Sequence, residues 1–310
     1  MISKEELIDA LPLADDYREI KIAKKKGGWR NVLIPSPGLK KLQRRILRSL
    51  RGIWQNPYVA GVYGIHPGPS YIDHALLHSE NRFLFQFDLE NAFSSVNILE
   101  LKKILIKRLQ NLFEKKEEAE ELVELIVRLT TFRNTLPQGA PTSPFLYFLF
   151  ITESGLIEKL WSLCPPGWKI SCYVDDFIIS GPKPLSPEKQ EEIIRCLKDY
   201  GFEINLQKIR QFDCRQGVPL ITGVRTDGIR KRISLPKKEI KRWRGIIHRA
   251  TLSSNPVLIK KVEGFISSLQ LIYGNALPAQ IKKPYQELKG DLPPFKRLRR
   301  LRQTRLTKWM

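Results

Sequence analysis

The stretch Cys172-Tyr173-Val174-Asp175-Asp176-Phe177-Ile178-Ile179 places two adjacent aspartates inside an otherwise apolar run. A carboxylate in an apolar strand is costly unless it is paired or coordinates a cation. Aspartate is also a good turn former. We therefore interpret this run as two short strands joined by a hairpin whose tip is formed by Val174, Asp175 and Asp176.

A third aspartate stands in a comparable setting. Asp88 ends the buried-type run Phe83-Leu84-Phe85-Gln86-Phe87, and turn formation does not explain an isolated aspartate at a strand end. A strand-end aspartate beside a hairpin-tip aspartate makes an oxygen-rich site for Mg²⁺, which prefers carboxylates, water and substrate phosphates. Two such ions about 3.5–4 Å apart can activate a 3′-hydroxyl and stabilise a leaving pyrophosphate. The three acids therefore predict phosphoryl transfer.

The charge of the chain points to a polyanionic substrate. The 310 residues include 53 lysines and arginines against 32 aspartates and glutamates, a formal net charge of +21, and a hydrophobic content of 42% argues against disorder. So large an excess favours nucleic acid as the partner, with a very soluble charged surface as the alternative. Together with the acids, it predicts a nucleic acid strand extended by nucleoside triphosphates.

Membrane, secreted and zinc-binding classes are disfavoured. The most apolar run, residues 145–151, is far shorter than the roughly 20 residues that a spanning helix needs. The N-terminal segment has no apolar signal region, and the four cysteines form no CxxC pair. We expect a cytoplasmic protein with no membrane partner.

The hydrophobic periodicity predicts a mixed α and β chain. Helices are expected at residues 1–14, 39–51, 71–79, 98–110, 115–130, 187–200 and from 236 onward. Strands are expected at 17–34 (a hairpin), 83–88, 168–179 (a pair), 204, 209–212, 220–224 and 229–235. A basic tail follows at 293–310.

Several segments, taken together and in this order, resemble the prokaryotic reverse transcriptases, and the retron type most closely. They are Phe87-Asp88-Leu89-Glu90-Asn91-Ala92-Phe93, Leu136-Pro137-Gln138-Gly139-Ala140-Pro141-Thr142-Ser143-Pro144, the YxDD box Tyr173-Val174-Asp175-Asp176, and the GxxxNxxK segment at 201–208. Segment 262–269 resembles the helical thumb. The chain departs from the family at His74 and Ile221, where Asn and Val are usual, and at Ile209, where Thr usually follows the lysine.

The resemblance implies a role for each matching position. Asp88, Asp175 and Asp176 would hold two Mg²⁺ ions, with Leu89 included in the metal set. Lys208 would neutralise or protonate the leaving pyrophosphate, and Phe93 would be the aromatic gate against a ribose 2′-hydroxyl, so deoxynucleoside triphosphates are the implied substrates. Phe93 as an ordinary core residue is the alternative.

Other positions would contact nucleotide or RNA. Gln138 and Gly139 would line the nucleotide pocket, glycine permitting close backbone approach, while Arg30 and Lys26 would bind the triphosphate. RNA contacts are expected from Lys40, Lys41, Arg44, Arg45, His78, Arg242, Trp243 and Arg244.

Some of these assignments keep an alternative. Trp243 could stack on RNA or belong to the core, and His74 and His78 could contact RNA or pack beneath the palm. Tyr147 and Phe148 are bulkier than the residues usual in the family and would reshape the template side of the pocket.

We therefore predict an α+β right-hand polymerase with an antiparallel palm sheet and a helical thumb. Fingers and N-terminal helix would occupy residues 1–80, the palm 81–235 with an inserted segment at about 98–135, and the thumb and basic tail 236–310. The implied function is RNA-directed DNA synthesis on a cognate structured non-coding RNA, serving as template and primer, in a retron that makes RNA-linked single-stranded DNA for antiphage defence with a toxic effector protein. The alternatives are another defence or abortive-infection reverse transcriptase with protein-primed or untemplated synthesis, and a non-catalytic RNA-binding scaffold.

Overall fold

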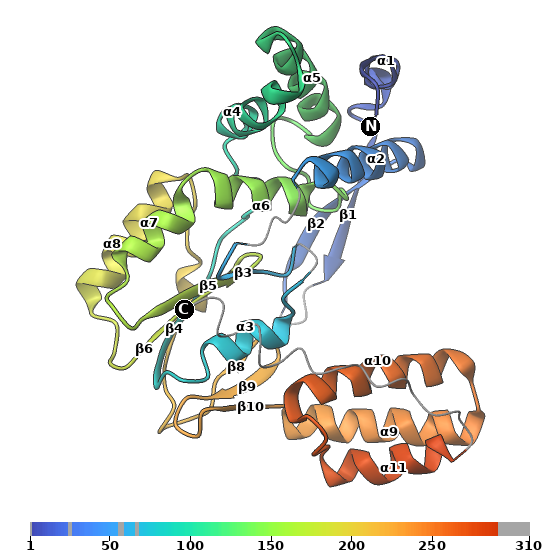
Figure 1. Cartoon of the computed structure of the whole chain (residues 1–310), viewed down its shortest axis with the longest axis vertical. Helices are drawn as coiled ribbons and strands as arrows, with labels where there is room; N and C mark the ends of the chain where they lie inside the picture. Colours follow the sequence, from blue (N-terminus) through green and yellow to red (C-terminus); the bar gives the residue numbers. More distant parts are fainter. Residues whose placement is uncertain (1, 24–26, 55–58, 66–67, 291–310) are drawn as a thin grey trace. The chain divides into compact units, whose positions relative to one another are not determined.

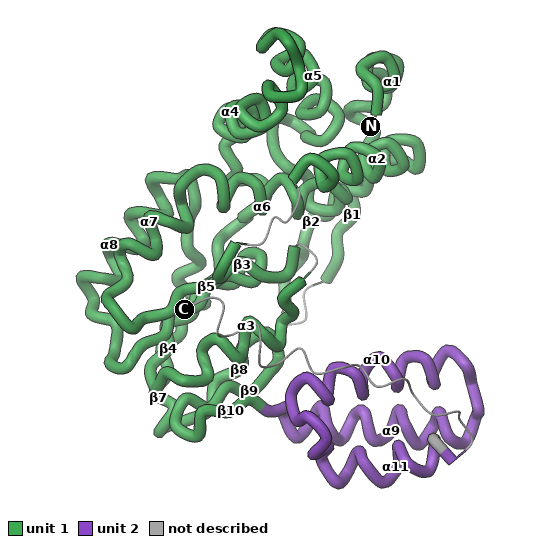
Figure 2. Tube along the Cα trace, viewed as in Figure 1, with its two compact units in different colours: residues 1–233 green, residues 234–310 purple. Residues whose placement is uncertain are grey.

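The computed structural model describes all residues except 1, 24–26, 55–58, 66–67 and 291–310. The chain divides into two compact units, residues 1–233 and 234–310, which are described separately (Figure 2). Lys26 and the basic tail lie outside the described residues. In the part of the chain that is described, no helix is both long and apolar enough to cross a bilayer.

A five-stranded sheet forms the centre of the first unit, in the order β3-β5-β6-β4-β7 (Figure 1). Its strands are β3 (Val62–Tyr63), β4 (Phe83–Asp88), β5 (Lys169–Tyr173), β6 (Asp176–Gly181) and β7 (Arg210–Asp213). β3 pairs with β5 in parallel, and the other pairs are antiparallel. The register matters for function because it pairs Asp88 with Asp176 across β4 and β6.

A long hairpin and a basic helix precede this sheet. β1 (Tyr17–Ala23) and β2 (Trp29–Pro35) pair along their full length, from Tyr17 opposite Pro35 to Ala23 opposite Trp29. Helix α2 (Pro37–Ile53) follows directly; Ser36 caps its first turn by accepting from the Leu39 N–H, with a proline at the first helical position. Its apolar stripe is buried and its basic face is turned outward.

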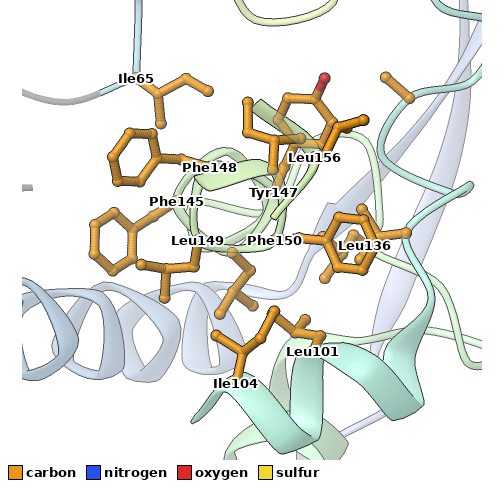
Figure 3. Packing of buried hydrophobic residues seen from close by; sticks show 14 of the residues in the cluster. Ile65, Leu101, Ile104, Leu136, Phe145, Tyr147, Phe148, Leu149, Phe150 and Leu156 are labelled. Atoms are coloured by element: carbon orange, nitrogen blue, oxygen red, sulfur yellow. The ribbon is translucent and has the colours of Figure 1, made fainter. Parts of the chain in front are cut away.

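Helix α6 (Ser143–Glu153) is the core of the first unit. Except for Pro144 and Glu153, its residues are buried, as expected for a helix that is apolar on all sides. Figure 3 shows its aromatic side chains radiating outward, with Leu101 and Ile104 of helix α4 (Ile98–Leu109) packed near one side. The position of α6 brings Tyr147 toward the turn that precedes β6.

The remaining elements of the first unit are helices and a small sheet. They are α1 (Lys4–Asp9), η1 (Leu11–Leu13), α3 (Tyr71–Leu77), η2 (Gln110–Leu112), α5 (Lys116–Thr130), α7 (Leu156–Leu163), α8 (Pro187–Asp199), η3 (Leu206–Lys208), β8 (Leu220–Ile221), β9 (Val224–Asp227) and β10 (Arg232–Ser234), the last crossing into the second unit. The small sheet has the order β10-β9-β8.

The second unit consists, in its described part, of helices α9 (Lys237–Ser253), α10 (Pro256–Tyr273) and α11 (Ala279–Lys289). Its core includes Ile247, Val262 and Leu269, and the Leu235 N–H donates to the Tyr273 hydroxyl at 2.8 Å. The helices are therefore held by a hydrophobic core of their own.

The mixed architecture with an antiparallel sheet agrees with the predicted α+β class. One element is corrected: Ile204, predicted as a short strand, forms a single bridge to Leu89. The chain turns into η3 at Leu206, which leaves no room for a ladder.

Candidate active site

Three acids from two segments of the chain lie together where β4 ends and β6 begins, at one end of the interior strands of the central sheet. Asp88 is the last residue of β4 and faces Asp176, the first residue of β6, while Asp175 stands in the two-residue turn from β5 to β6. The Leu89 N–H donates to the Asp175 carbonyl at 2.9 Å, which ties the turn to the end of β4. The structure thus brings together the aspartates that the sequence pattern singled out.

The turn that carries Asp175 has an unusual backbone. Val174 has a φ of +59°, where hairpins normally place glycine or asparagine, and a β-branched residue there is strained. The Val174 N–H donates to the Tyr63 carbonyl at 3.2 Å, and the Val174 carbonyl accepts from the Tyr147 hydroxyl at 3.1 Å. Contacts on both sides of the residue therefore hold this conformation.

Burial and mutual repulsion disfavour ionisation of the acids. Burial raises the pKa of Asp175, and the negative charge of Asp88 adds to that rise. Burial likewise raises the pKa of Asp176 to about 6, with Gln86 opposing the rise by donating to its two carboxylate oxygens at 2.9 and 3.2 Å. A cation bound between these carboxylates would lower both pKa values again, because it favours the ionised form of each acid.

Two basic side chains act on the acids. Lys208, at the end of η3, forms an ion pair with Asp88, and its segment is anchored by the Asn205 N–H, which donates to the Asp88 carbonyl at 2.9 Å. The charges of Lys208 and of Arg30, near the start of β2, both lower the pKa of Asp175. Arg30, predicted to bind the triphosphate, and Lys208, predicted to act on the leaving pyrophosphate, therefore both lie within electrostatic reach of Asp175.

The donor chemistry of the site fits a divalent cation. Among the described residues no three His, Cys, Asp or Glu side chains come close enough to enclose an ion. Mg²⁺ commonly takes only one or two carboxylates and completes its shell with water and substrate phosphates. In this structure the ammonium group of Lys208 already supplies a positive charge beside the Asp88 carboxylate. Asp88, Asp175 and Asp176 are thus suitable partial ligands for an ion that arrives with substrate.

Gly139 contacts the N-terminal hairpin. The Leu33 N–H of β2 donates to the Gln138 carbonyl at 2.9 Å, and Gly139 has a φ of +132°. A Cβ on Gly139 would come within 2.5 Å of the Leu33 carbonyl oxygen and 2.8 Å of Val32. The sequence predicts that this glycine allows close approach by a nucleotide; in the structure it is strand β2 that approaches closely, which corrects that reason. The place of Gly139 in a nucleotide pocket stays a prediction.

Phe93 lies beside Tyr147. The two ring centroids are 5.4 Å apart at 62°, and the Phe93 side chain is partly buried. Tyr147 itself is fully buried, and burial raises the pKa of its phenol well above the usual value, so the hydroxyl remains a donor. Phe93 thus combines a partly exposed surface with a core contact, and its role as a gate stays a prediction.

His78 is fully buried, which corrects its predicted contact with RNA. Its Nδ1 and Nε2 lie 2.7 and 2.6 Å from the hydroxyls of Ser180 on β6 and Ser171 on β5. His74 is also buried, and its ring stacks against Tyr173 at 5.9 Å. Both histidines pack against the strands that carry the acidic turn, which was the second of the two expected alternatives.

The residues predicted to contact RNA, apart from His78, lie on helices α2 and α9. On α2, Lys41 and Arg44 are exposed, Lys40 is half-buried, and Arg45 is bound to Glu6 at 2.7 Å. On α9, Arg242 and Arg244 are exposed, but Trp243 stacks on Phe265 of α10 at 3.9 Å. Trp243 therefore belongs largely to the core of its unit. Because Arg45 is already paired with Glu6, its charge is less available to RNA, and the contacts of Lys40, Lys41, Arg44, Arg242 and Arg244 remain predictions.

Gln86 and the role of Tyr147 were missed by sequence reasoning, which placed Tyr147 on the template side of the pocket. Gln86 holds Asp176, and its signal was the single polar residue inside the apolar run that leads to Asp88. Tyr147 holds the Val174 carbonyl, and its signal was the single hydroxyl among the apolar residues 145–151.

The family of the chain follows from comparison with known proteins. Residues 22–241 match the family described as Reverse transcriptase (RNA-dependent DNA polymerase), and the chain belongs to this family.

Solved telomerases from Candida tropicalis share the fold. One without bound ligand has a TM-score of 0.52 at 12% identity and matches 88% of this chain and 58% of its own. One in complex with a TWJ fragment of telomeric RNA has a TM-score of 0.51 at 12% identity and matches 91% of this chain and 56% of its own. The predicted right-hand polymerase fold is confirmed.

Among sequence relatives, the chain is similar to retron reverse transcriptases, as predicted. It is 27% identical to the retron Mx65 reverse transcriptase of Myxococcus xanthus, over 77% of this chain and 57% of that protein. It is 28% identical to the retron Ec73 reverse transcriptase of Escherichia coli, over 66% of each. The chain thus spans less than two thirds of the length of either relative.

Proposed function

We propose that the chain is an RNA-directed DNA polymerase that extends a strand with deoxynucleoside triphosphates. The observation that carries the proposal is the pairing of Asp88 with Asp176 across two strands, with Asp175 in the adjoining turn. Two Mg²⁺ ions, when bound to these carboxylates, would activate the 3′-hydroxyl and stabilise the leaving pyrophosphate.

The protein's own residues supply the rest of the site. Arg30 holds the triphosphate by bidentate contact, because a guanidinium matches phosphate geometry. Lys208 exchanges its contact with Asp88 for the pyrophosphate once substrate enters, and Phe93 fills the space that a 2′-hydroxyl would need. The second unit acts as the thumb.

The exposed face of α2 offers a track for an RNA backbone. Lys41, Arg44, Arg48 and Arg51 are exposed and recur at helical spacing on one face, and none forms an ion pair with a described residue. Four cations over ten positions span about 15 Å along the helix axis. Phosphate contacts along this track would give sequence-independent affinity for the template.

The track is tested by the salt dependence of RNA binding. Replacing Arg44 and Arg48 with Gln should lower the slope of log affinity against log salt by about two contacts. The matched control is Arg45→Gln on the same helix, whose charge is already satisfied by Glu6 and which should change the slope by much less. Equal effects of the double variant and the control would refute the track.

The catalytic proposal is tested by primer extension on an RNA template with Mg²⁺. The parent should extend the primer, and Asp175→Asn and Asp176→Asn should abolish extension. Asp199→Asn, an exposed acid at the end of α8, should leave extension intact. Equal signal from the parent and the Asp175 and Asp176 variants, or none from the parent, would refute the proposal.

The proposed template is a cognate structured non-coding RNA of the retron type, supported by the similarity to retron reverse transcriptases. A defence role with a toxic effector protein extends the same analogy. Sequencing of nucleic acid that copurifies with the protein tests the assignment. One abundant RNA joined to DNA is the expected result, whereas homopolymeric or untemplated DNA would instead indicate the other class of defence reverse transcriptase.

A further inference from the structure

The turn between β5 and β6 needs support from outside itself. Tyr173 pairs with Asp176, so only Val174 and Asp175 connect the two strands. Primed two-residue turns, the usual hairpin connections, require a positive φ at the first residue, and glycine or asparagine normally supplies it. Here the residue is Val174, with a φ of +59°. Its side chain disfavours that conformation, so contacts with neighbouring elements must hold the turn.

Tyr147 provides such a contact from helix α6. Its hydroxyl donates to the Val174 carbonyl at 3.1 Å, one peptide bond before Asp175. The side chain is fully buried in the core of the first unit. Because the Tyr147 side chain is enclosed in the core, opening this hydrogen bond would leave its hydroxyl without a partner, which opposes displacement of the turn.

The ring of the same residue contacts Phe93. The two rings meet edge to face at 5.4 Å, and on another side Phe202 meets Tyr147 at 6.1 Å and 82°. Phe93 is the residue to which sugar selection is assigned. The Tyr147 side chain thus contacts both the turn that carries Asp175 and Phe93, the residue proposed to select the sugar.

Ordinary packing does not account for the hydroxyl. The neighbouring large side chains of α6, Phe145, Phe148 and Phe150, are all phenylalanine, and Figure 3 shows them with Tyr147 around one helix. Phenylalanine would fill the same space without a polar atom to bury. The hydroxyl is explained by its bond to Val174.

We propose that Tyr147 is a positioning residue that couples the acidic turn to the sugar gate. Its hydroxyl fixes the Val174 peptide and thereby Asp175, and its ring supports Phe93 from behind. This inference rests on the proposed polymerase function. It assigns to the core helix α6 a direct part in the geometry of catalysis, although Tyr147 contacts no substrate.

Two substitutions separate the two halves of the proposal. Tyr147→Phe removes the hydroxyl and keeps the ring, so turnover should fall about tenfold or more while the KM for deoxynucleotide and the preference for deoxynucleotide over ribonucleotide stay unchanged. Tyr147→Leu also removes the ring edge, so the preference should fall about tenfold in addition. Phe150→Leu is the matched control, because it deletes a buried ring of α6 that contacts Phe202 at 5.7 Å. It should cost stability without changing the preference.

A metal-binding readout keeps the test independent of polymerase activity. Terbium luminescence titrated against the full-length protein should show about tenfold weaker binding for Tyr147→Phe than for the parent. Equal terbium affinity and equal turnover in Tyr147→Phe would overturn the role of the hydroxyl. Equal sugar preference in Tyr147→Leu and Phe150→Leu would overturn the role of the ring. If the parent fails to polymerise, the proposed function fails, and the terbium comparison still decides the role of the hydroxyl at the turn.

Discussion

Replacing Gly139 with alanine should damage the junction between the Gln138 loop and strand β2. The new Cβ would lie 2.5 Å from the Leu33 carbonyl oxygen and 2.8 Å from a methyl group of Val32, so either the loop or β2 must move. The φ of +132° adds backbone strain of about 1–3 kcal/mol for any residue with a side chain. Loss of the hydrogen bond from the Leu33 N–H to the Gln138 carbonyl costs about 1 kcal/mol more.

The expected loss in the free energy of unfolding is therefore about 2–4 kcal/mol, measured by urea denaturation. Gly167→Ala is the matched control. Its φ of +83° lies much closer to the left-handed region, where a side chain costs about 1 kcal/mol, and its Cβ would meet no described atom within 4 Å, so this variant should lose only about 1 kcal/mol. Because β2 also carries Arg30, Gly139→Ala should raise the KM for deoxynucleotide about tenfold. An unfolding free energy no lower than that of Gly167→Ala would refute the steric argument.

Three further outcomes are expected. Burial holds the pKa of His74 at about 3, below the ordinary 6.5, so the unfolded chain binds a proton that the folded chain does not. As the pH falls from about 6 to 4, this one histidine should lower the free energy of unfolding by about 1.4 kcal/mol per pH unit, in addition to the effect of the buried His78, whose pKa burial also lowers. His74→Phe also removes two buried ring nitrogens that have no hydrogen-bond partner among the described residues. It should reduce the slope by the contribution of His74 in urea titrations at several pH values, and an unchanged slope would contradict the assignment. Phe93→Val should increase the incorporation of ribonucleotide relative to deoxynucleotide at least tenfold in single-nucleotide extension. An unchanged ratio would show that Phe93 is an ordinary core residue. Mg²⁺ should raise the melting temperature of the parent by a few degrees and leave that of Asp175→Asn unchanged; equal shifts would place the ion elsewhere.

Local sequence patterns predicted much of the fold. Strand β4 runs over Phe83–Asp88 with both predicted ends, and helix α5 begins one residue after the predicted start. These elements combine a clear hydrophobic period with strong end signals, so propensity and tertiary packing agree. Ile204 was wrong as a strand because one apolar residue before η3 has no partner strand beyond Leu89.

The sequence predicted the site residues whose burial would be unfavourable without a functional reason. Asp88, Asp175 and Asp176 drew attention because acids in apolar runs require a reason. The contact of Gly139 with Leu33 left no such trace, since it joins backbone atoms more than 100 positions apart. His78 was misassigned because a histidine on a short helix gives no sign of whether it faces solvent or the hydroxyls of Ser171 and Ser180.

The conformation of Val174 bears on how this protein would respond to selection for heat resistance. A screen that scores only folded protein would favour glycine or asparagine at this position, because both accept a positive φ at lower cost. Glycine would also make the peptide before Asp175 more mobile, and the gain in stability would come with a less precise site. Thermostable variants of this chain should therefore be sought away from the β5–β6 turn, with residue 174 held constant during library design.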